Sequence, residues 1–181
     1  NKQNLSFIFA VAKKFKLKES NILKIINKFK GLKFRQETIY KSQLFSIIND
    51  SKATSYSSSE NILKSLEKVY WILGGVPKSG DKFWMSKKEC KNFNAYIFGK
   101  KRKYFINQLK NKVAYKSFAT LNNVVKKINK DLKFEKDLRN LTILFSPSAA
   151  SFDSFKNFED RGKYFNFLLK KYKIQKNINA V

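Results

Sequence analysis

The stretch "LFSIINDSKAT" (residues 44–54) joins an almost unbroken apolar run to a run of short polar residues. A solvent-exposed loop does not need so hydrophobic an approach, whereas a buried strand that delivers polar groups at its carboxyl end has this pattern. In open α/β sheets ligands bind at that edge. We therefore expect a buried strand here, followed by part of a binding site.

Strand patterns alternate with helical patterns on both sides of this stretch. Residues 38–49 predict one strand or a hairpin, and further strands are expected in "KVYWILGG" (68–75), "NAYIFG" (94–99), "VAYKSF" (113–118) and "LTILFSPSAAS" (141–151). Helices are expected from Glu60 onward, after the serines that precede it, and over residues 100–110, 121–132 and 157–172. The alternation predicts an α/β fold with a doubly wound, Rossmann-like, mostly parallel sheet of about five or six strands.

Two amphipathic helices are expected before this fold, over residues 4–16 and 19–29, and Gly31 would end the second. We predict a domain boundary near residues 36–40. Residues 1–37 then form the helical end of one domain, and residues 38–181 form a second domain that ends in a frayed tail. Because the sequence starts without Met and without a signal-peptide pattern, we expect a fragment of a longer protein.

Composition narrows the class of protein. Hydrophobic residues make up 43% of the 181 residues, which is enough for a sizeable core. The single cysteine, Cys90, excludes an internal disulfide framework and fits the reducing cytoplasm, where we expect this protein to lie. No apolar run reaches about 18 residues, so neither a membrane span nor a membrane partner is expected.

The net charge of +26 would favour nucleic-acid binding if it were concentrated in one stripe. However, only four of the 39 basic residues are arginines, and the lysines are scattered through every segment. Lys, Asn, Ile, Phe and Tyr are all abundant, as codon usage in an A/T-rich genome would produce. We therefore expect no nucleic-acid partner. A DNA affinity that depends steeply on salt and also prefers a sequence or structure would support the opposite view.

Unusual polar segments follow three of the expected strands: "NDSKAT" (49–54), "GGVPKSGD" (74–81) and "SPSAASFDSFKNFEDRG" (146–162). Each could be an ordinary turn or helix cap. In a parallel sheet, however, all three would begin at the same edge. They would bring Lys52 and Lys78 near the hydroxyls of Thr54 and Ser151, a set that can hold a carboxylate or a phosphate.

These segments, together with "FKGLKFRQE" (29–37) and in this order, resemble the carboxyl-terminal part of the Mur ligases. The segment "NKQNLSFIFAVA" (1–12) resembles the end of the family's central ATP-binding domain, and residues 38–181 resemble its amino-acid-binding domain. In this family ATP phosphorylates a substrate carboxylate, and an amine attacks the acyl phosphate. The final motif resembles that of the member that adds D-glutamate to UDP-N-acetylmuramoyl-L-alanine in peptidoglycan synthesis. The resemblance therefore implies these two substrates, ATP, Mg²⁺ and a monomeric enzyme.

The resemblance also implies roles for individual residues. Lys52 would act in catalysis, between the amino acid and the reacting phosphate. Thr54 and Lys78 would hold one carboxylate of D-glutamate. The other carboxylate would be held by Ser151 and by the backbone around Phe152 and Phe158. Residues implied to face the nucleotide are Asn4 near the adenine, Arg35 at the terminal phosphate, and Asp50.

The sequence also departs from the family pattern. Phe34 stands where the family usually has a histidine, and Val76 and Pro77 stand where relatives are more often polar or glycine. The 181 residues contain no GxxxxGK[ST] phosphate loop and no histidine. ATP phosphates and Mg²⁺ are thus expected to be bound mainly by another part of the protein, and the chain alone is expected to be inactive. A non-catalytic doubly wound anion-binding module, or a family relative with another amino-acid specificity, are the alternatives.

Overall fold

The computed structural model describes residues 2–29, 31–135 and 137–174. The chain divides into two compact units, Asn1–Leu32 and Lys33–Val181. Most of the predicted frayed tail lies outside the described residues. Within the described ranges, no helix is both long and apolar enough to cross a membrane.

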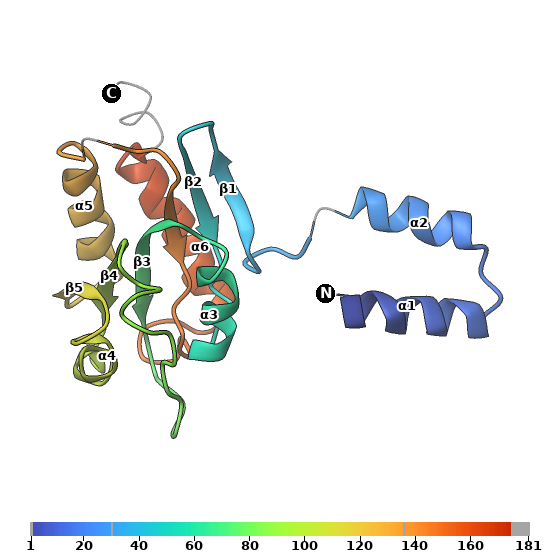
Figure 1. Cartoon of the computed structure of the whole chain (residues 1–181), viewed down its shortest axis with the longest axis horizontal. Helices are drawn as coiled ribbons and strands as arrows, with labels where there is room; N and C mark the ends of the chain where they lie inside the picture. Colours follow the sequence, from blue (N-terminus) through green and yellow to red (C-terminus); the bar gives the residue numbers. More distant parts are fainter. Residues whose placement is uncertain (1, 30, 136, 175–181) are drawn as a thin grey trace. The chain divides into compact units, whose positions relative to one another are not determined.

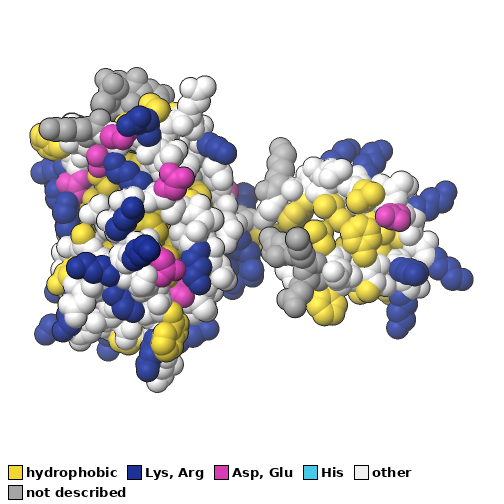
Figure 2. Space-filling view, viewed as in Figure 1, with side chains coloured by type: hydrophobic (Ala, Val, Ile, Leu, Met, Phe, Trp, Pro, Cys, Tyr) yellow, Lys and Arg dark blue, Asp and Glu magenta, His cyan; other side chains and the backbone are white. Residues whose placement is uncertain are grey.

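The first unit contains two helices, α1 (Lys2–Lys14) and α2 (Glu19–Lys28), at the positions expected from their apolar spacing (Figure 1). Many apolar side chains on them are exposed, including Phe7, Val11 and Ile25, and they form the hydrophobic patches that Figure 2 shows on this unit. The assignment of these helices to the end of an ATP-binding domain stays a prediction.

The second unit is a six-stranded sheet in the order β1-β2-β6-β3-β4-β5 (Figure 1). Its strands are β1 (Glu37–Lys41), β2 (Phe45–Asn49), β3 (Lys68–Gly74), β4 (Phe93–Phe98), β5 (Ala114–Phe118) and β6 (Leu141–Phe145). Its helices are α3 (Tyr56–Leu63), α4 (Arg102–Leu109), α5 (Leu121–Leu132) and α6 (Phe158–Lys171). Only β1 is antiparallel to its neighbour, so the predicted mostly parallel α/β fold is confirmed.

Both faces of the sheet are covered, which explains why its strands are continuously apolar in sequence. Successive residues of the central strand β3 pack into two different clusters. Tyr70 and Ile72 pack on the face that carries α5 and α6. Trp71 and Leu73 pack on the other face, with residues of α3 and α4. Lysine and arginine side chains are scattered over the surface of this unit that Figure 2 shows.

Two local expectations change in the structure. Residues 38–49, expected to be one strand or a hairpin, form a hairpin of β1 and β2. Helix α3 begins at Tyr56, and not at Glu60 as predicted. The serines before Glu60 resemble a capping sequence because serine is favoured at N-caps. Only Ser55 caps the helix, accepting a hydrogen bond from the Ser58 amide, and Ser59 lies inside the helix with its side chain buried.

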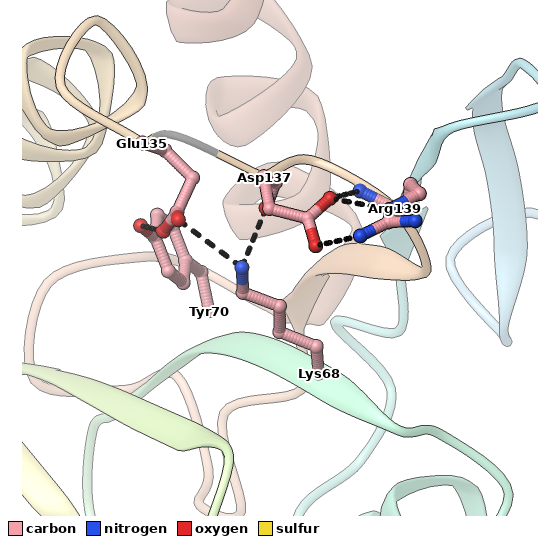
Figure 3. A network of polar contacts seen from close by, with 5 residues as sticks. All are labelled: Lys68, Tyr70, Glu135, Asp137 and Arg139. Carbon is pink, nitrogen blue, oxygen red and sulfur yellow. Dashed lines mark hydrogen bonds and ion pairs between the residues drawn. The ribbon is translucent and has the colours of Figure 1, made fainter.

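A network of polar side chains lies at the amino-terminal edge of the sheet (Figure 3). Lys68, the first residue of β3, contacts Glu135 Oε1 at 3.1 Å, and the Tyr70 hydroxyl donates to Glu135 Oε2 at 2.6 Å. Asp137 accepts three hydrogen bonds from Arg139, one from its backbone amide and two from its guanidinium. Burial raises the pKa of Glu135, but the hydrogen bonds from Tyr70 and Lys68 outweigh it and lower that pKa overall. The network fastens the α5–β6 connection to β3, at the edge opposite the polar strand ends.

Candidate anion-binding site at the carboxyl edge of the sheet

The carboxyl ends of β2, β6 and β3 are joined by backbone hydrogen bonds. The Asp50 amide donates to Phe145 O at 2.7 Å, and the Ser146 amide donates to Ile72 O at 3.2 Å. Gly74 N, in the last residue of β3, donates to Pro147 O at 3.0 Å. Beyond the strands, Val76 pairs with Ala150 in an isolated bridge. The three polar segments singled out in the sequence therefore leave the sheet side by side.

Arg161, on α6, fastens these three segments together, and sequence reasoning missed it. Its side chain is fully buried. The guanidinium donates from Nε to Ser51 Oγ at 3.1 Å and from Nη2 to Ser51 O at 2.7 Å. Nη1 donates to Ala149 O at 2.9 Å and to Gly74 O at 3.4 Å. Burial lowers the pKa of Arg161 to about 10, against the attraction of Asp153, so a cation lies behind the strand ends at neutral pH.

Asp50 follows β2 directly and is almost completely buried. Its Oδ1 accepts a hydrogen bond from the Gln36 amide at 3.1 Å, and its Oδ2 accepts one from Ser146 Oγ at 3.0 Å. Burial raises the pKa of Asp50 to about 6, although both hydrogen bonds and the charge of Arg35 act in the opposite direction. At pH 7.5 the carboxyl group is therefore mostly ionised, and each oxygen retains capacity to accept a further bond.

Arg35 is exposed in a turn that is pinned to the same edge. Phe34, beside it, is buried in a left-handed backbone conformation with φ of 62°. Its ring lies so close to the α-carbon of Gly162 that a Cβ there would collide with it. The Phe34 carbonyl accepts a hydrogen bond from the Lys52 amide at 3.0 Å. Phe34 thus anchors the turn through packing.

Lys52 and Phe158 come together although they are far apart in the sequence. The Lys52 Nζ lies 4.1 Å from the centroid of the Phe158 ring, a cation–π contact. The Ser51 hydroxyl donates to Phe158 O at 2.8 Å, which holds the amino-terminal end of α6 against the segment after β2. The predicted catalytic lysine therefore contacts one of the residues predicted to bind D-glutamate.

Lys78 is exposed in the segment after β3 and makes no ion pair within the described part of the chain. Asp81 ties this segment to α3: its Oδ2 accepts a hydrogen bond from the Tyr56 amide at 2.8 Å, and its carbonyl accepts one from the Tyr104 hydroxyl. Thr54, half-buried, lies two residues before Tyr56. The segments that carry Lys78 and Thr54 are thus directly linked.

The remaining predicted residues differ in their surroundings. Ser151 is buried in the segment after β6, whereas the Phe152 side chain is 75% exposed. Asn4 lies in α1 of the first unit, and its position relative to the other residues is not described. Within residues 2–29, 31–135 and 137–174, no group of three or more His, Cys, Asp or Glu side chains could hold a metal ion.

A shallow pocket of about 240 Å³ lies at the other edge of the sheet, beside the β1–β2 turn. Its lining includes Leu44, Glu67 and Asn140, and none of the predicted site residues. It therefore belongs to a different part of the surface.

Comparisons with known proteins bear on the resemblance. No protein-family model matches the chain. The chain is 36% identical, over 168 residues, to a curated UDP-N-acetylmuramoylalanine–D-glutamate ligase of Wolbachia pipientis wMel, covering 91% of the chain and 32% of the relative. It is 34% identical to the protein of the same name in Rickettsia prowazekii, covering 95% of the chain and 38% of the relative. The predicted resemblance to the Mur ligases is confirmed.

A solved structure agrees at the level of the fold. The crystal structure of a MurF ligase from Thermotoga maritima in complex with ADP superposes with a TM-score of 0.59 at 12% identity. The match covers 92% of this chain and 36% of that chain. The chain spans about a third of the length of the Mur ligases that it matches.

Proposed function

We propose that this chain is the amino-acid-binding part of an ATP-dependent ligase that adds D-glutamate to UDP-N-acetylmuramoyl-L-alanine. The observation that carries the proposal is the joining of three polar strand ends around the buried Arg161, with Lys52, Lys78, Thr54 and Ser151 on them. The two relatives named above, both UDP-N-acetylmuramoylalanine–D-glutamate ligases, support the choice of amino acid.

Each role in D-glutamate binding follows from the chemistry of the side chain. Lys78 is exposed and without an ion pair in the described residues, so its ammonium group is available to a carboxylate of the ligand. Thr54 adds a hydroxyl donor from the linked segment. Ser151 and the backbone near Phe152 and Phe158 would take the other carboxylate. Two carboxylates next to several cations are held by charge-assisted hydrogen bonds.

The Lys52 ammonium would neutralise negative charge that builds up between the amino acid and the phosphate being displaced. Its contact with Phe158 limits the conformations of a long side chain, so less entropy is lost when the ligand binds. Acyl transfer through a phosphorylated carboxylate depends on such positioning and charge neutralisation.

Three residues would face the nucleotide. Arg35 is exposed and held by its turn, and its planar guanidinium suits a terminal phosphate. Asp50 is an acceptor for nucleotide hydroxyls, and Asn4 is proposed to lie near the adenine. Mg²⁺ would supply charge neutralisation at the ATP phosphates. Since no metal-binding cluster occurs among the described residues, we propose that this ion is held by another part of the protein.

A full-length protein that contains this chain, proposed to be a cytoplasmic monomer, provides the test. It is assayed for ADP release with ATP and UDP-N-acetylmuramoyl-L-alanine, with D-glutamate, L-glutamate or L-lysine as the amine. Of the three amines, we expect only D-glutamate to give ADP release. Release only with another amino acid would indicate a relative of different specificity. Binding of D-glutamate without ADP release would indicate an anion-binding module and would contradict the ligase proposal.

A further inference from the structure

A row of buried hydroxyl groups leads away from the Asp50 carboxylate into the core. Ser146 Oγ lies 3.0 Å from Asp50 Oδ2, and Ser59 Oγ lies 2.7 Å from Ser146 Oγ. Ser148 Oγ continues the row, 2.7 Å from Ser59 Oγ. The three serine side chains are fully buried and come from two elements, α3 and the segment after β6.

The row has a defined direction when Asp50 is ionised. A carboxylate can only accept, and each hydroxyl has a single proton to donate. Ser146 therefore donates to Asp50. The Ser59 hydroxyl donates to Ser146 Oγ at 2.7 Å, which is closer than its other acceptor, the Ser146 carbonyl at 3.3 Å, and Ser148 donates to Ser59. All three O–H dipoles then point toward the negative charge. Hydrogen bonds in such a row polarise one another, and the effect is strongest where water is excluded.

We propose that Ser146 and Ser59, with Ser148 behind them, are positioning residues that keep the Asp50 carboxylate ionised and fixed as an acceptor for the nucleotide. The nucleotide as ligand rests on the proposed function, whereas the action of the hydroxyls on Asp50 does not. A protonated Asp50 would donate a hydrogen bond from one oxygen. It would then be a poorer partner for the hydroxyls of a nucleotide, which need an acceptor.

The surroundings of Asp50 show why such support is needed. Burial by itself favours the protonated carboxyl group and is the largest influence on its pKa. Besides Ser146, the Gln36 amide and the charge of Arg35 oppose this effect of burial. Ser148 has a left-handed backbone with φ of 56°, which residues other than glycine rarely adopt. The chain thus takes a strained conformation at Ser148, the end of the row farthest from Asp50.

The competing explanation is that the serines only satisfy one another in a buried space. Removal of Ser59 would then leave the Asp50 carboxyl unaffected, because Ser59 does not touch it. Our proposal requires the opposite, since Ser146 loses its own donor when Ser59 is removed.

The test is a carboxyl ¹³C NMR titration of Asp50 in the chain, with the signal assigned by its loss in Asp50→Asn. We expect Ser146→Ala to raise the pKa of Asp50 by about 1 pH unit or more, because a hydrogen bond to a charged group is lost. Ser59→Ala should raise it by a smaller amount. Ser46→Ala is the matched control, because it removes a β2 hydroxyl that bonds Thr142 and does not reach the row. It should leave the Asp50 pKa unchanged.

A pKa that stays unchanged in Ser59→Ala or in Ser146→Ala, or that moves equally in Ser46→Ala, overturns the proposal. Amide spectra report whether each variant is folded. If Ser146→Ala does not fold, the Asp50 pKa in Ser59→Ala tests the proposal. In the full-length protein, Ser146→Ala should move the acid limb of kcat/KM for ATP to higher pH without changing KM for D-glutamate. A shifted Asp50 pKa in a protein that does not ligate D-glutamate would refute the proposed function and leave the positioning effect standing.

Discussion

Replacement of Asp50 by asparagine should make the folded chain more stable at neutral pH, although it removes a group proposed to contact the nucleotide. Burial raises the pKa of Asp50 from 3.8 to about 6. A group whose folded pKa is raised contributes its stability below its unfolded pKa and loses it as the pH rises through the folded value. At about 1.4 kcal/mol per pH unit, ionised Asp50 therefore costs the folded state about 3 kcal/mol at pH 7.5.

The asparagine avoids this cost because it carries no charge and its amide oxygen can still accept from Gln36. With the two pKa values above, the stability advantage of Asp50→Asn is about 1 kcal/mol at pH 4.5 and about 3 kcal/mol at pH 7.5. Urea unfolding measures it, followed by the fluorescence of Trp71, which is completely buried in the second unit. For an m-value of about 2 kcal/mol/M, the midpoint should rise by about 1.5 M at pH 7.5.

Asp160→Asn provides the control, since it makes the same chemical change at an exposed position of α6. Its effect should stay within about 0.5 kcal/mol, as is usual at the surface. The reasoning is refuted if the advantage of Asp50→Asn is the same at both pH values, or if the variant is less stable than the original chain at pH 7.5.

Two further substitutions test the packing of the site. Arg161→Met should destabilise the chain by more than about 3 kcal/mol, because it leaves buried carbonyl groups without a donor. The control Arg139→Met, at an exposed position, should cost less than about 1 kcal/mol. Equal losses of stability in urea unfolding would contradict the proposal that Arg161 holds the three segments together. Gly162→Ala should cost about 1–3 kcal/mol, because its Cβ would strike the Phe34 ring. In a Phe34→Ala background the same change should be neutral or stabilising, as alanine favours a helix, and a cost that persists there would argue against this cause.

The sheet could be predicted because its signal is local. A strand buried on both faces, such as β3, is apolar at nearly every position, and residues with opposite orientations within it pack on the two faces. The polar segments after β2, β3 and β6 were recognised for the same reason, since each follows directly on such a run. The meeting of these segments follows from the rule that parallel strands end at one edge.

The buried contacts that hold the site residues in place could not be predicted, because they join residues that are distant in sequence. Arg161 donates hydrogen bonds to Ser51, Gly74 and Ala149. No local sequence pattern predicts that the arginine in "NFEDRG" will be buried. Ser59 was interpreted as part of a capping sequence, although its partner is Ser146. The role of Phe34 depends on the space left by Gly162, which only the folded chain reveals.

The central claim is that the joined strand ends bind D-glutamate through Lys78, and steady-state kinetics of the full-length protein with Lys78→Ala tests it most directly. Loss of a charge-assisted hydrogen bond costs about 1.5–3 kcal/mol. KM for D-glutamate should therefore rise about tenfold to hundredfold, while KM for ATP changes little. Lys87→Ala, which removes the same charge from an exposed position in the same connection, should leave both constants unchanged. An unchanged KM for D-glutamate in Lys78→Ala, or an equal rise in Lys87→Ala, would contradict the account.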